Sequence, residues 1–169
     1  MIALSQLNAG SRAEFVNAIG PVFEHSPWIA GAVWTQRPFA GVDQLHAALC
    51  DTVTRAGEEK QLALICAHPD LVGRAALAGK LTRESASEQA GAGLDRLSPE
   101  EIAWFEKSNA AYREKFGFPF VICARRNHKE AIVQGLTARL QHSRAQEIKT
   151  ALEEIFKIAE LRLRDLISN

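Results

Sequence analysis

A chain of 169 residues is long enough to bury a substantial core without disulfides or structural metals. Its 20 Lys and Arg residues balance 20 Asp and Glu residues, so no net charge favours nucleic acid or an anionic membrane as a partner. No apolar run approaches the roughly 18 residues of a membrane span, and the N-terminus does not look like a secretion signal, so we expect a cytoplasmic protein that binds no membrane.

Helix-start and helix-stop signals divide most of the chain into short helices. Serine and glutamate three residues apart, a spacing that can cap a first helical turn, occur at Ser11 and at Ser98. Pro69 must end the preceding helix at about residue 67, because the residue before a proline is pushed out of the helical region. The helices with the clearest signals are predicted to cover 42–55 and 58–67 and to begin near Ser11, Ser26, Ser98, Asn127 and Ser143.

The segment 116–123, FGFPFVIC, differs from its surroundings because it is aromatic and β-branched and has no helical period. It is predicted to be a buried, extended connector whose backbone groups must bond side chains, water or a ligand. A pocket wall and a hydrophobic core strut are both open interpretations. The whole pattern predicts an all-α fold, a single compact domain over 1–169 of about seven or eight helices with this one connector.

Several side chains could carry chemistry, and each also has a purely structural interpretation. His68 lies at a helix C-terminus, where the helix dipole favours an imidazolium, but it could equally bond the last carbonyls. Ser85, Glu88 and Gln89 form a polar cluster, although S-x-x-E is also a capping box. Trp28 and Trp34 are expected in the core.

Arg162 occupies a position on the apolar seam of the last helix, whereas Arg164 falls on the opposite face. A buried guanidinium requires a carboxylate, because an unpaired buried charge is strongly unfavourable. An internal partner such as Glu88 and the carboxylate of a ligand both fit this requirement.

The remaining motifs exclude several familiar kinds of site. The three cysteines, Cys50, Cys66 and Cys123, lack C-x-x-C spacing and indicate buried thiols in a reducing compartment. Metal-ligand spacing and a Gly-x-Ser-x-Gly turn are also missing from the sequence, so we expect no metal. A histidine, an arginine, a carboxylate and an amide favour a small anionic substrate, with the histidine moving a proton.

Several separate motifs are similar to one enzyme family. HPDLVGRAA (68–76), LTRESASEQAGAGLDRLSPEE (81–101), NAAYREKFGFPFVICAR (109–125) and KIAELRLRDL (157–166) resemble the 2-oxo-4-hydroxy-4-carboxy-5-ureidoimidazoline (OHCU) decarboxylase family, as does FEHSPWIAGAVWTQRPF near the N-terminus. The resemblance implies an all-helical lyase that needs no cofactor and converts OHCU into S-allantoin in uric acid degradation. It also implies a homodimer.

The resemblance further implies which residues act. The catalytic residues would be His68, Glu88 and Arg162. The substrate-binding residues would be Pro69, Ser85, Ala86, Ser87, Glu88, Gln89, Phe120, Val121, Ile122, Cys123, Ala124 and Arg162. Two other hypotheses stay open at this point: a non-catalytic helical binding module, and an enzyme acting on another ureido or imidazolone acid.

Overall fold

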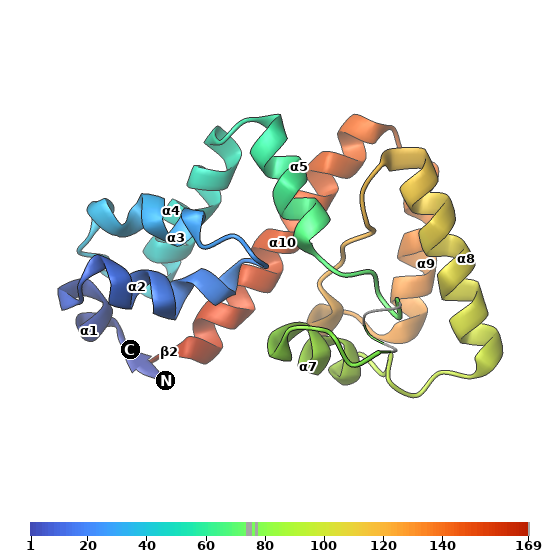
Figure 1. The fold of residues 1–169 in the computed structure, drawn as a ribbon, viewed down its shortest axis with the longest axis horizontal. Coiled ribbons are helices and arrows are strands. Elements are labelled where there is room, and N and C mark those ends of the chain that lie inside the picture. Colours follow the sequence, from blue (N-terminus) through green and yellow to red (C-terminus); the bar gives the residue numbers. More distant parts are fainter. Residues whose placement is uncertain (74–75, 77, 169) are drawn as a thin grey trace. The chain divides into compact units, whose positions relative to one another are not determined.

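The computed structural model describes residues 1–73, 76 and 78–168. The described residues form nine α-helices, three short 3₁₀ turns and one pair of two-residue strands, so the all-α prediction is confirmed (Figure 1). The chain divides into two compact units, Met1–Ala67 with Phe156–Asn169, and His68–Ile155. Each unit is described by itself below. That 1–169 form one domain stays a prediction.

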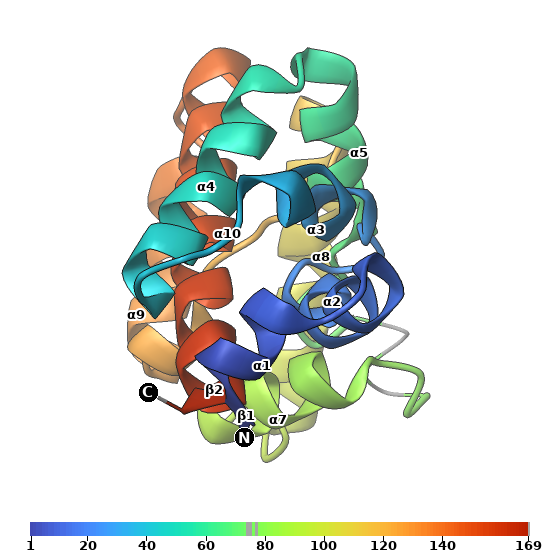
Figure 2. The same ribbon diagram turned by 90° about the vertical axis from the view of Figure 1, so that its left-hand side faces the viewer.

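The first unit consists of short helices and one small parallel sheet. Strand β1 (Ile2–Ala3) pairs with β2 (Ile167–Ser168), with Ile2 opposite Ile167 (Figure 2). The helices of this unit are α1 (Leu4–Ala9), α2 (Arg12–Ile19), α3 (Trp28–Val33), α4 (Val42–Arg55) and α5 (Glu58–Ala67). The last part of α10 (Arg144–Leu166) also belongs to it. Within the unit, α3 packs against both α2 and α4.

The second unit contains α7 (Arg83–Gly91), α8 (Pro99–Phe116), α9 (Lys129–Arg139) and the first part of α10. Between α8 and α9 the chain runs through the non-helical segment 117–123 into the 3₁₀ turn η3 (Ala124–Arg126). Phe118 and Phe120 of this segment pack on Tyr112, with ring centroids 6.1 and 5.4 Å away. The predicted buried connector is therefore confirmed.

Local signals placed several helix ends correctly. The bounds of α4 and α5 match the predicted ranges, and α5 ends at Ala67, just before the residue that precedes Pro69. Both predicted capping boxes form: the Ser11 N–H donates to Glu14 at 2.7 Å, and the Ser98 N–H donates to Glu101 at 2.8 Å. These interactions join residues three apart, so the sequence alone specifies them.

Two residues that the sequence offered as helix caps do not cap their helices. Helix α7 is capped by Thr82, whose hydroxyl accepts from the Ser85 N–H at 3.3 Å, so Ser85 lies inside the helix and is not its N-cap. Helix α9 is capped by His128, whose Nδ1 accepts from the Ala131 N–H, whereas Asn127 donates to the Cys123 carbonyl. The cap is thus formed three residues before Ser85 in one case and by the residue after Asn127 in the other.

Burial also differs from expectation at several side chains. Trp28 and Trp34 are partly exposed rather than fully in the core. Among the cysteines, Cys123 is buried and Cys50 half-buried, but Cys66 is exposed, so the expectation of three buried thiols was wrong there. In the part of the chain that is described, no helix is both long and apolar enough to cross a membrane.

Candidate active site

The loop that carries His68 is a tight turn with unusual backbone geometry. The His68 side chain is buried, with 6% of its surface exposed. Two residues later the chain turns through 70–73, where the Gly73 N–H donates to the Asp70 carbonyl at 3.3 Å. A Cβ at position 73 would lie 2.7 Å from the Asp70 Cβ, so the turn requires glycine.

Helix α7 presents one polar face toward the interior of the second unit. Ser85 and Gln89, one helical turn apart, are buried, and Glu88 is half-buried on the same face. Ala86 and Ser87 are exposed. Because Thr82 caps this helix, the Ser85 hydroxyl is not required for capping. Of the five predicted substrate-binding residues on α7, three therefore share an inward face.

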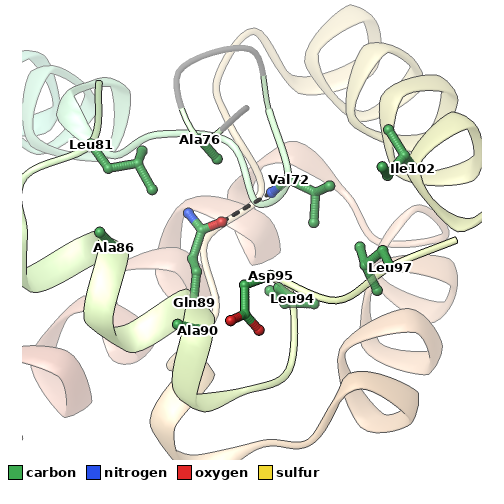
Figure 3. Close-up of a pocket in the computed structure, with 10 residues that line it drawn as sticks. All are labelled: Val72, Ala76, Leu81, Ala86, Gln89, Ala90, Leu94, Asp95, Leu97 and Ile102. Carbon is green, nitrogen blue, oxygen red and sulfur yellow. Dashed lines mark hydrogen bonds between the residues drawn. The ribbon is translucent and has the colours of Figure 1, made fainter. Parts of the chain in front are cut away.

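Gln89 connects this face directly to the His68 loop. Its Oε1 accepts a hydrogen bond from the Val72 N–H at 3.1 Å, drawn in Figure 3. Its Nε2 faces the Asp70 carbonyl at 3.5 Å, a long and weak contact. The structure thus brings the turn after His68 and helix α7 together, although 16 residues separate His68 from Ser85 in the sequence.

The end of the 117–123 segment joins the same cluster. Helix α7 packs against η3, which begins at Ala124. The pKa of the Cys123 thiol is raised by burial, which outweighs a lowering by the backbone hydrogen bond with Arg126; the negative charges of Glu154 and Glu88 raise it further. Glu88 is therefore close enough to Cys123 for its charge to act there. The turn that follows His68 and the end of this segment therefore both lie against α7 in the second unit.

Several backbone groups of the segment already have protein partners. The Val121 carbonyl accepts from Arg139 at 2.8 Å, and the Cys123 N–H donates to Glu154 at 2.8 Å. The Cys123 carbonyl accepts from Asn127 and from the Arg126 N–H, both at 3.0 Å. These bonds satisfy the groups concerned without a ligand, as the core-strut interpretation expects. Substrate contacts to Phe120–Ala124 stay a prediction.

Arg162 is buried, as its seam position predicted, and lies in the first unit. Its Nη1 forms an ion pair with Glu24 at 2.9 Å and faces the Pro21 and Val22 carbonyls at 3.4 Å. Glu24 is itself 3% exposed. The structure thus pairs Arg162 with Glu24, an internal carboxylate that the sequence did not single out. Arg164 is half-exposed and pairs with Glu160 and Asp43.

Sequence reasoning missed the buried polar residues that support the site. Asn109 is 5% exposed and donates to the Leu71 carbonyl at 2.8 Å. A usable signal existed, because Asn109 falls on the buried face of α8 between Phe105 and Tyr112. Glu24 and Glu154 gave no comparable signal, since their partners are distant in the chain.

One cavity of about 330 Å³ lies in the second unit beside the same turn (Figure 3). Its described lining is largely apolar, and Gln89 and Asp95 supply polar groups. The described lining residues do not include His68 or Glu88. This cavity is therefore not where the predicted acid or base would act.

Comparison with known proteins supports the motif resemblance over the whole chain. The OHCU decarboxylase family model matches residues 8–164. The chain is 43% identical to the OHCU decarboxylase of Halalkalicoccus jeotgali, with 98% of this chain and 92% of that protein covered. It is 46% identical to the one of Amia calva, with 97% and 94% covered. It is also 39% identical to a uric acid degradation bifunctional protein of Bacillus sp. (strain TB-90), of which it covers 32%.

Solved structures agree with these sequence relationships. The crystal structure of an (S)-allantoin synthase superposes with a TM-score of 0.81 at 30% identity, covering 99% of this chain and 54% of that chain. An OHCU decarboxylase crystallised in the presence of (S)-allantoin gives a TM-score of 0.70 at 24% identity, which supports the fold alone. The residues that the family model matches include the His68 turn, helix α7 and most of helix α10. The chain belongs to the OHCU decarboxylase family.

Proposed function

We propose that this protein is a carboxy-lyase that decarboxylates OHCU to S-allantoin in uric acid degradation. The observation that carries the proposal is the buried His68 on a turn held against the polar face of α7, in a chain whose relatives are named OHCU decarboxylases. The substrate is a small anion rich in N–H groups. A histidine with nearby carboxylate and amide groups suits such a molecule.

The reaction breaks the bond between the substrate carboxylate and the ring carbon that also bears a hydroxyl. The electron pair left behind passes to the adjacent ring C=N, so the chemistry requires neither a metal nor an organic cofactor. His68 takes or shares the hydroxyl proton as the carbonyl forms. A proton must then reach one face of the neighbouring carbon, and a fixed protein group delivers it stereospecifically.

The other predicted residues bind and orient the substrate. Arg162 orients the substrate carboxylate, since a planar guanidinium can bind a carboxylate through two parallel N–H donors. Glu88 accepts hydrogen bonds from the ureido and ring N–H groups, with help from Gln89. Pro69, Ser85 and the segment Phe120–Ala124 complete the site. A homodimer and a cytoplasmic location are part of the same proposal.

The decisive experiment follows freshly generated OHCU by circular dichroism. With the protein present, we expect rapid appearance of optically active allantoin. Slow, racemic decay equal to that of OHCU alone would refute the proposal and would favour a helical binding module. If the protein converted another ureido acid but not OHCU, it would still be an enzyme of this class, but its substrate would differ from the one proposed.

The variant His68→Asn tests the acid or base role directly. General acid or base action by one group accounts for about 10²- to 10⁴-fold in rate, so turnover should fall by that order. The folded state should persist by far-UV circular dichroism. Full turnover in the folded variant would remove His68 from the mechanism.

A further inference from the structure

The turn that follows His68 contains a residue in a conformation that its side chain disfavours. Val72 has φ = +54°, in the left-handed region that β-branched residues rarely adopt, and it is buried. Backbone of this kind persists where the surrounding structure over-determines it, and it concentrates at functional sites. The turn at 70–73 therefore needs support from outside its own four residues.

Side chains from two helices of the second unit supply this support. Gln89 of α7 accepts from the Val72 N–H at 3.1 Å. Asn109 of α8 donates to the Leu71 carbonyl at 2.8 Å. Arg113, one turn further along α8, donates through Nε to both carboxylate oxygens of Asp70, at 3.0 and 3.1 Å. Three consecutive residues after Pro69 are each held by a side chain from α7 or α8.

Asn109 is the most informative of these side chains. It lies on a face of α8 that otherwise buries aromatic residues. Its Oδ1 is buried without a hydrogen-bond partner among the described residues. An apolar residue would avoid this unfavourable burial but would remove the donor to the Leu71 carbonyl. What the amide provides is one short bond, from Nδ2 to the Leu71 carbonyl.

We infer that Asn109 is a positioning residue for His68, assisted by Arg113. By fixing the Leu71 carbonyl and the Asp70 carboxylate, the two side chains hold the strained turn and thereby the orientation of the imidazole relative to α7. The catalytic part of this inference rests on the proposed function. Asn109 itself does not touch the substrate.

The test replaces Asn109 by leucine, which keeps the volume and removes the donor. Misplacing a catalytic group by about 1 Å can cost on the order of 10²-fold in rate, so we expect kcat to fall by about 10- to 100-fold. The KM should change by less than about 3-fold. Val53→Ala, which opens space at a fully buried position on α4 in the first unit, is the control for general destabilisation.

The same substitution in the His68→Asn background separates positioning from general damage. Residues that act as a unit are strongly non-additive, so Asn109→Leu should then lower kcat by less than about 3-fold. Arg113→Gln, at a half-exposed position, should retain the fold and show a smaller loss that also disappears in this background. Equal losses with and without His68, or full activity of both single variants, would overturn the inference.

A readout independent of turnover is the ring ¹H–¹³C NMR signal of His68. The chain has five histidines, and His68→Asn assigns the signal by its disappearance. Asn109→Leu should shift this signal, whereas Val53→Ala should leave it in place. If wild-type protein does not convert OHCU, the proposed function fails, and the NMR result still decides whether Asn109 positions His68. An unchanged His68 signal in folded Asn109→Leu would contradict that role.

Discussion

Arg139 is a buried residue whose removal should strongly weaken the second unit. It forms an ion pair with Glu147 at 2.9 Å, with 8% of the arginine and 0% of the glutamate side chain exposed. Glu147 also accepts from the Tyr112 hydroxyl and contacts His142 Nδ1 at 2.7 Å. Arg139 further donates to the Val121 carbonyl and lies over the Phe120 ring, 4.4 Å from its centroid.

Replacing Arg139 by methionine keeps much of the side-chain length but leaves Glu147 without its guanidinium. Removal of one partner of a buried ion pair typically costs about 3–5 kcal/mol, because the remaining charge stays desolvated. The unpaired Val121 carbonyl contributes to this loss. Against a total stability of about 5–15 kcal/mol for a protein of this kind, the change should be large.

Urea unfolding at pH 7, followed by far-UV circular dichroism, measures the effect as a change in the free energy of unfolding. Arg55→Met is the matched control, because its ion pair with Asp51 is 78% and 53% exposed and should contribute less than about 1 kcal/mol. The double variant Arg139→Met with Glu147→Leu should recover part of the loss. A loss below about 1 kcal/mol for Arg139→Met would refute this account of the network.

Three further predictions concern single side chains. Tyr112 is the one tyrosine of the chain, and burial, reinforced by its hydrogen bond to Glu147, raises its pKa well above the usual value near 10. Its phenolate absorbance at 295 nm should be missing from the native protein at pH 11. Stability should fall as pH rises above about 10, because the tyrosine of the unfolded chain ionises there while the native one stays protonated. A native titration midpoint near pH 10 would contradict this. Burial, with the nearby charge of Glu160, raises the pKa of Cys50 to about 12, and burial also raises the pKa of Cys123. Because the thiolate is the reactive form of cysteine, iodoacetamide at pH 8 should modify exposed Cys66 before the other two cysteines. Peptide mass spectrometry can check this order. Arg162→Lys should lower kcat/KM for OHCU by about 10- to 100-fold, since a lysine ammonium does not reproduce the planar pair of N–H donors of a guanidinium. Unchanged kinetics would assign Arg162 a role in the fold alone.

The sequence by itself determined the features that depend on neighbouring residues. The bounds of α4 and α5, the capping boxes at Ser11 and Ser98, and the inward direction of Arg162 all follow from spacings of three or four residues or from a proline. The non-helical conformation of 117–123 also followed from the local sequence. Such signals survive folding because the groups that interact are already close in the chain.

Only the tertiary structure decided which distant polar groups meet. Glu24 pairs with Arg162 across 138 positions, and Asn109 bonds Leu71 across 38. A helical pattern tells that a side chain faces inward, but several carboxylates and carbonyls satisfy the same requirement for a buried donor. The choice among them depends on the packing of whole helices. For that reason only the fold showed that Gln89, Asn109 and Arg113 hold the turn after His68.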